Sequence, residues 1–178
     1  MEDMLPWGGR EYCLLLGVML LGRGADFLST WVATPTLLLE ANPLAKKLGW
    51  KWGSVVNLAL CLGFAFFALP AVIITTCSLL VAAHNFQRAW LMRTMGETSY
   101  RDWYVERVSE TRPTLYLFCL FGETVLTAAV GGLLLYFSEL AVIPFGIGMG
   151  IVAYAAAVTF YTLLALWRLR RAERWKTL

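Results

Sequence analysis

The residues best suited to chemistry are three ionisable side chains that lie inside long apolar stretches. Arg23 and Asp26 lie near the middle of the first such stretch, and Glu123 lies near the middle of a later one. An ionised side chain at that depth in a bilayer costs about 2.5–3.5 kcal/mol on insertion scales, so membrane proteins carry one mainly where it is paired or functional. We therefore interpret the three residues as the centre of an intramembrane site for an ion, a proton or a small polar ligand.

Helical periodicity adds threonines to this site. At about 100° per residue, Arg23, Asp26, Thr30 and Thr34 fall within an arc of about 80°, which predicts one polar stripe facing protein rather than lipid. Arg23 and Asp26 are i,i+3 neighbours and can form an ion pair directly. We expect this pair to be the centre of the stripe.

A second helix is expected to complete the cluster. Thr127 follows Glu123 by one helical turn, so both side chains lie on one face. Counting residues from the start of each apolar stretch puts Glu123 at the same depth as Arg23 and Asp26. This predicts that the three charged side chains meet between the two helices.

Polar residues continue beyond the first apolar stretch. Glu40 and Asn42 lie in the connector that follows, and Asn57 lies near the start of the next apolar stretch. We expect these three side chains to form the outer mouth of the site. Asn42 followed by Pro43 also predicts a helix start, with Asn42 as the cap and Pro43 at the first helical position.

These residues carry a resemblance to a family. Asp26-x-x-x-Thr30, followed by Glu40-x-Asn42-Pro43, resembles a group of small uncharacterised bacterial membrane proteins that contain a domain of unknown function. They share an intramembrane Asp, a Thr one turn later and a Glu-x-Asn-Pro segment after the first helix. The resemblance covers about residues 15–65 and implies that these residues belong to one site.

The composition explains why such a site would lie in a membrane. Of the 178 residues 59% are hydrophobic and 15% charged, whereas soluble domains are typically 45–50% apolar and about 25% charged. Four apolar stretches, about 12–34, 53–83, 113–137 and 140–167, each reach the ~20 residues that a transmembrane helix needs. We predict an all-α fold with four transmembrane helices in one integral membrane domain, residues 1–178. Pro70 predicts a kink in the second helix.

The basic residues predict a topology. Eleven Lys and Arg residues fall in the N-terminal segment, the connector 84–112 and the C-terminal tail, whereas three fall in the connector 35–52. The excess of positive charge marks the cytoplasmic side, so we expect both termini in the cytoplasm. We expect the protein to be integral to a bacterial inner membrane. Gly96 interrupts the connector 84–112, and short amphipathic helices are expected in both connectors, at the membrane surface.

Packing and partners follow from the fourth apolar stretch and the tail. Gly146, Gly150, Ala153 and Ala157 fall on one helical face, which predicts close packing either within the bundle or across a dimer. Four helices bury little surface alone, so we expect a homo-oligomer or a larger membrane complex. The basic tail predicts contact with anionic lipids at the cytoplasmic face rather than with nucleic acid.

No cofactor or metal is expected, and two other function classes remain open. Cys13, Cys61, Cys77 and Cys119 lack metal-ligand spacing and are interpreted as free thiols, and His84 as a helix-end residue. One alternative is an intramembrane enzyme that acts on a lipid or peptide at the outer headgroup level through Glu40, Asn42 and Asp26, with or without a metal. The other is a non-catalytic subunit of a larger membrane assembly.

Overall fold

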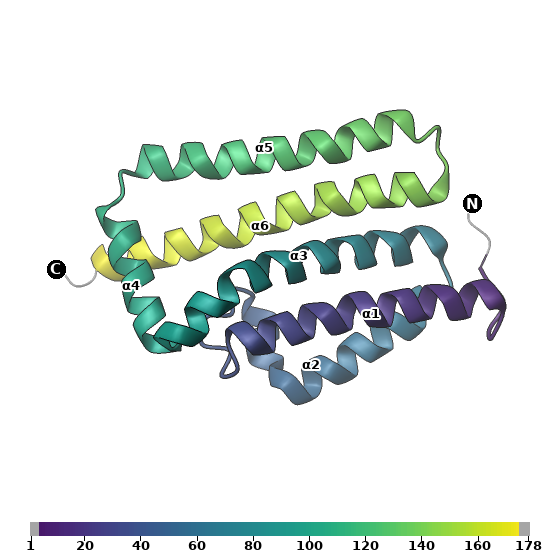
Figure 1. Cartoon of the computed structure of the whole chain (residues 1–178), viewed down its shortest axis with the longest axis horizontal. Coiled ribbons are helices and arrows are strands. Elements are labelled where there is room, and N and C mark those ends of the chain that lie inside the picture. Colours follow the sequence, from purple (N-terminus) through teal and green to yellow (C-terminus); the bar gives the residue numbers. More distant parts are fainter. Residues whose placement is uncertain (1–3, 175–178) are drawn as a thin grey trace.

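The described part of the chain is helical throughout. The computed structural model describes residues 4–174, with side chains for 4–171, and no strand occurs in that range. The helices are α1 (Arg10–Ala33), α2 (Pro43–Phe64), α3 (Ala68–Met95), α4 (Glu97–Glu110), α5 (Pro113–Phe137) and α6 (Val142–Arg174) (Figure 1). By length and composition, α1, α3, α5 and residues Val142–Arg171 of α6 can each span a membrane. The predictions of an all-α fold and of four membrane-capable helices are confirmed at this level.

The second apolar stretch differs from the prediction, because it is not one kinked helix over 53–83. α2 ends at Phe64, the chain turns through residues 65–67, and α3 begins at Ala68. Pro70 lies in the first turn of α3, where the missing N–H of proline removes no helical hydrogen bond. Pro70 therefore marks a helix start, and the predicted kink at this position is wrong.

The helices form a layer in which α5, α6, α3 and α1 lie side by side, with α2 against α1 (Figure 1). α1 and α3 run parallel, because residues further along α1 contact residues further along α3. Gly22 of α1 lies against Thr75 of α3, and Thr30 contacts Asn85. Two parallel helices need a return segment, and α2 carries the chain back along the layer.

The small residues of α6 form a contact inside the bundle. A Cβ atom built on Gly150 would lie 2.6 Å from Thr76 Cβ of α3, and one on Gly146 would be similarly close to Val72. Ala153 is exposed and Ala157 is half-buried. Of the two arrangements left open by the sequence, Gly146 and Gly150 therefore serve packing of α6 on α3.

The two ends of the layer differ. At one end, Tyr12 Oη donates to the Leu62 carbonyl at 3.3 Å and Leu5 N donates to the Phe66 carbonyl at 3.0 Å, so the N-terminal segment lies against the turn between α2 and α3. At the other end, α4 lies across the ends of the long helices, near the C-terminal end of α6 (Figure 1). The first and last described residues therefore lie at opposite ends of the layer.

Candidate intramembrane polar site

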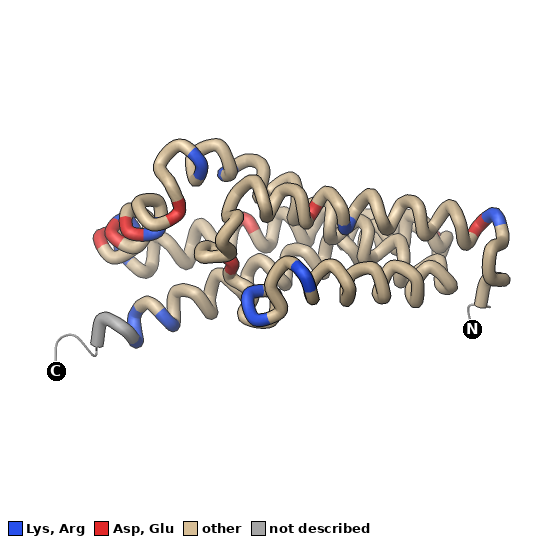
Figure 2. The backbone as a smooth tube through the Cα atoms, turned by 90° about the horizontal axis from the view of Figure 1, so that it is seen from below, with Lys and Arg blue, Asp and Glu red and all other residues tan. Residues whose placement is uncertain are grey.

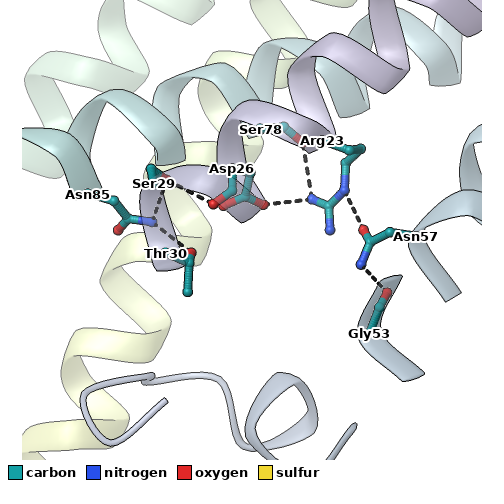
Figure 3. Close-up of polar contacts among 8 residues, drawn as sticks. All are labelled: Arg23, Asp26, Ser29, Thr30, Gly53, Asn57, Ser78 and Asn85. Carbon is teal, nitrogen blue, oxygen red and sulfur yellow. Dashed lines mark hydrogen bonds and ion pairs between the residues drawn. The ribbon is translucent and has the colours of Figure 1, made fainter. Parts of the chain in front are cut away.

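Arg23 and Asp26 form an ion pair on α1, as their i,i+3 spacing predicts. Arg23 Nη1 lies 3.0 Å from Asp26 Oδ2. Arg23 Nε donates to Asn57 Oδ1 of α2 at 2.6 Å, and Nη1 donates to Ser78 Oγ of α3 at 3.1 Å (Figure 3). One guanidinium group therefore joins three helices, with the Asp26 carboxylate as its counter-charge.

The pair is partly open. The side chains of Arg23 and Asp26 are 26% and 16% exposed. Asp26 Oδ2 accepts the bond from Arg23, while no donor to Asp26 Oδ1 occurs among the side chains described here. A carboxylate oxygen accepts hydrogen bonds or binds cations, so Asp26 keeps the capacity to bind a proton, an ion or a polar group.

Polar contacts continue from the ion pair along the α1–α3 interface. Asn85 Nδ2 donates to Ser29 Oγ and to Thr30 Oγ1, both at 3.2 Å. Ser29 Oγ in turn donates to the main-chain carbonyl of Asp26 at 2.8 Å (Figure 3). Thr30 therefore lies where the predicted stripe places it, facing another helix.

Sequence reasoning missed three of these partners, although a signal for two of them existed. Ser78 and Asn85 are seven residues apart and so share one face of α3. A polar pair at this spacing in an apolar stretch indicates a second stripe that can face the first. Ser29 carries no comparable signal, because Ser in a helix commonly bonds to its own backbone.

A second cluster lies one turn beyond Thr30, where the Glu97 carboxylate binds the loop after α1. Glu97 Oε2 accepts from Thr34 Oγ1 at 2.7 Å, from Thr36 Oγ1 at 2.6 Å and from Leu38 N at 3.2 Å. Glu97 Oε1 accepts from Thr36 N at 3.0 Å. Four bonds therefore tie the start of α4 to residues 34–38, and we call this contact the Glu97 latch.

The latch affects the titration of Glu97. Partial burial acts to raise the pKa of this carboxyl, but the hydrogen bonds from Thr36, Thr34 and Leu38 outweigh it, so the pKa lies below the ordinary value of 4.5. A carboxyl with a depressed pKa in the folded state stabilises the fold above its unfolded pKa, and this contribution is lost as pH falls through the folded pKa. The latch is therefore intact at neutral pH.

We expect Glu97→Gln to lower the melting temperature at pH 7 by roughly 2–4 °C, the shift produced by about 1 kcal/mol in a chain of this size. The difference from wild type should be constant above pH 5 and should shrink below the ordinary pKa, as wild-type Glu97 becomes protonated. Thermal unfolding in detergent across this pH range measures it. Glu106→Gln, on the exposed side of the same helix, is the control and should show no difference. A Glu97→Gln effect that grows on acidification would contradict the role given to the latch.

The latch also corrects the predicted topology. The connectors 35–52 and 84–112 were expected on opposite sides of the membrane, yet Thr36 and Leu38 of the first bind Glu97 of the second. This prediction is wrong, because the undetected turn at 65–67 hid one passage of the chain along the bundle. Both connectors lie at the α4 end.

The three residues predicted to form an outer mouth do not act together. Asn57 binds Arg23 and lies in the centre of the site. Asn42 Oδ1 accepts from Leu44 N at 3.0 Å, which confirms it as the cap of α2. Glu40 Oε1 accepts from Asn42 N at 2.8 Å, within the same turn. Glu40 and Asn42 therefore shape the connector.

Glu123 and Thr127 lie outside the site. Both belong to α5, which packs on α6, and α6 and α3 lie between α5 and α1 (Figure 1). The predicted meeting of Glu123 with Arg23 and Asp26 is wrong, because equal depth does not make two helices neighbours. Glu123 is instead near enough to His84 of α3 and Tyr154 of α6 to act on both electrostatically.

The remaining candidates for metal or redox chemistry are separate from one another. His84 packs edge-on against Tyr154, with ring centroids 6.5 Å apart. The four cysteines are free thiols, and no group of three His, Cys, Asp or Glu residues in the described chain is arranged to hold a metal ion. The side chains of the site thus offer one carboxylate, one guanidinium group, amides and hydroxyls.

Comparison with known proteins does not assign a function to this site. No family model matches the chain, and neither the curated proteins nor the solved structures contain a match to it. Function must therefore be argued from the site itself.

Proposed function

We propose that this protein is an integral membrane protein of transporter or channel type, in which the Arg23–Asp26 site binds a proton, an ion or a small polar solute. The observation that carries the proposal is the open carboxylate of Asp26, held against Arg23 among membrane-capable helices. A buried charge pair that only fixed helix register would need hydrogen bonds to both carboxylate oxygens to offset its desolvation. Among the described side chains no such bond to Asp26 Oδ1 occurs.

The helix that covers the site is loosely held, which supports a site that opens. Between Lys51 and Phe64 of α2, only Gly53, Asn57 and Cys61 are not exposed, and these lie at i, i+4 and i+8. α2 therefore touches the bundle along a narrow edge, and Asn57 of that edge binds Arg23. A small shift of α2 would uncover the ion pair without disturbing the contact between α1 and α3.

The polar contacts favour access from the α4 end, where the connector 35–52 that was predicted to form the mouth of the site also lies. The contacts that begin at Asp26 reach Thr30 and Asn85, and the separate cluster of Thr34 and Glu97 lies one helical turn further on, at that end. In the other direction α1 is apolar as far as Glu11. We therefore place the entrance to the site at the α4 end.

Charge distribution favours the cytoplasm as the compartment at this end. Apart from Arg10 and Arg23, the Lys and Arg residues of the described chain gather towards the α4 end, in the start of α2, the last turns of α3, α4, the link from α4 to α5 and the end of α6 (Figure 2). Positive charge beside membrane helices marks the cytoplasmic side and attracts anionic lipids. We propose a bacterial inner membrane with the C-terminus inside and the N-terminus outside, in place of the N-terminus inside.

Single-cysteine labelling tests this orientation. In a background with the four native cysteines replaced, a membrane-impermeant thiol reagent applied to intact cells should label Met4→Cys and should not label Arg101→Cys. After permeabilisation both should react, since both positions are exposed. If Met4→Cys is protected in intact cells and Arg101→Cys is not, the orientation is the reverse.

The resemblance to bacterial proteins with an Asp-x-x-x-Thr helix and a Glu-x-Asn-Pro segment enters here as a second support. Thr30 faces α3, Asp26 lies one turn before it beside Arg23, and Glu40 with Asn42 shapes the loop that Glu97 binds. We propose that the shared residues place the polar stripe of α1 and its closing loop in one site. This account gives each residue of the pattern a position near that site.

The function is tested by proton flux in proteoliposomes that contain an internal pH dye. Under an imposed potential, wild-type protein should change the internal pH faster than protein-free liposomes, and Asp26→Asn should reduce the rate to the protein-free level. Asn keeps the shape of the side chain but cannot carry the proton. Sodium and potassium gradients, read with ion-sensitive dyes, extend the test to ions.

Glu123→Gln is the matched control, because it removes the other intramembrane carboxylate, which lies outside the Arg23 network. Its flux should equal that of wild type. Equal flux in wild-type and Asp26→Asn liposomes would contradict the proposed function. A loss of flux in Glu123→Gln alone would show that the functional carboxylate is Glu123 on α5, not Asp26.

A further inference from the structure

The Glu97 latch occupies the end of the polar line that leads from Asp26. Thr34 is buried and lies one helical turn beyond Thr30, and its hydroxyl donates to Glu97 while accepting from Leu39 N at 3.1 Å. A proton or solute moving along the stripe between Asp26 and the α4 end must pass Thr34. In this structure Thr34 is buried and bonded to Glu97, so the polar stripe of α1 ends at the latch.

The closed loop depends on Glu97 for its shape. Leu37 has a φ of +58°, a left-handed conformation that is strained for a residue with a side chain. The main-chain N–H groups on either side of it, of Thr36 and Leu38, both donate to Glu97. Without the carboxylate these two donors lose their partner and less remains to offset the strain at Leu37, although Leu37 N and Leu39 N still donate to Thr34.

A hinge lies directly beside the latch. Gly96 separates α3 from α4 and has φ +80° and ψ 151°, a conformation that residues with a side chain rarely adopt. Glu97 is the next residue, so rotation about Gly96 withdraws the carboxylate from the loop and moves α4 together with it. Glycine hinges of this kind are typical of lids that move over a site.

We propose that the Glu97 latch is the gate of the Asp26 site at the α4 end. The gate is closed when Glu97 binds residues 34–38 and opens when α4 turns about Gly96. This rests on the proposed function for the location of the site, but the opening itself can be measured without any flux.

The test uses Thr30→Cys as a reporter, because Thr30 lies between the latch and Asp26. In a background without native cysteines, the reporter is exposed to an impermeant thiol reagent added from the α4 side, with and without Glu97→Ala. We expect labelling of Cys at position 30 to be about tenfold faster in Glu97→Ala, the change in open population that corresponds to about 1.4 kcal/mol. Thr36→Val, which removes one latch bond, should give a smaller increase, and Glu106→Ala none.

A second reporter separates gating from unfolding. Cys61 is buried at 1% exposure away from the latch, and a chain that retains only this cysteine should label slowly in every variant. Equal labelling of position 30 in Glu97→Ala and Glu106→Ala, or faster labelling of Cys61 in Glu97→Ala, would overturn the gate. Faster labelling of position 30 together with no flux in wild type would instead refute the proposed function and leave the opening movement established.

Discussion

Asp26→Ala is expected to destabilise the protein by about 3 kcal/mol and to lower its melting temperature by about 6–12 °C. Removing the carboxylate leaves the Arg23 guanidinium without its counter-charge, although its bonds to Asn57 and Ser78 remain. The effect lies at the lower end of the range for a broken buried pair, because 26% of the Arg23 side chain is exposed. Thermal unfolding in detergent measures it.

The control removes both charges. In Arg23→Leu/Asp26→Leu no unpaired charge is left, and apolar side chains replace the pair, so stability should return to within about 1 kcal/mol of wild type. A double variant as unstable as Asp26→Ala would show that the destabilisation does not come from the unpaired guanidinium. The account of the ion pair would then be wrong.

Gly150→Ala is expected to destabilise the contact between α3 and α6 by about 1–3 kcal/mol. The new Cβ would lie 2.6 Å from Thr76 Cβ and 2.9 Å from the Ile73 carbonyl oxygen. Both obstacles are close to or part of the α3 backbone, so the two helices must move apart. The melting temperature should fall by roughly 2–12 °C.

Gly132→Ala on α5 is the matched control, because nothing lies within 4 Å of the position its Cβ would take. Replacing a helical glycine in open space should be neutral or should stabilise by up to about 1 kcal/mol. If the two alanine variants shift the melting temperature equally in the same direction, close packing at Gly150 does not contribute to the fold.

Sequence patterns predicted α1, α5, α6 and one face of the site because these depend on local spacing. The stripe that begins with Arg23 and Asp26 follows from helical periodicity, and it does face α3. The cap by Asn42 and the packing of Gly150 were likewise visible as short-range patterns. In each case the residues that decide the outcome lie within a few turns of one another.

The turn between α2 and α3 could not be predicted in this way. Residues 65–67 are Ala-Phe-Phe, without glycine, proline or a polar residue, so the apolar stretch continues through the reversal. Pro70 was the one local signal, and it fits both a kink and a helix start. Because this reversal was missed, the predicted topology put Lys46, Lys47 and Lys51 at the opposite end of the bundle from the connector 84–112. The structure has both at the α4 end.

Which residues form the site depends on which helices are neighbours. The depth of a residue in the membrane does not by itself predict the neighbours of its helix. Glu123 matched Arg23 in depth, but α6 and α3 separate their helices. Glu97 was missed for the opposite reason: it lies among other charged residues of a connector, and its partners Thr34 and Thr36 are about 60 residues away. Only the preceding Gly96 sets it apart, as the last residue before a new helix.

The central claim is that Arg23 and Asp26 form a working site rather than a structural tie. The most direct measurement is proton flux in proteoliposomes of Arg23→Leu/Asp26→Leu, the variant expected to fold with nearly wild-type stability. We predict that its flux equals that of protein-free liposomes while its melting temperature stays close to wild type. Wild-type flux in this stable double variant would show that the pair only holds the helices together, and would contradict the account.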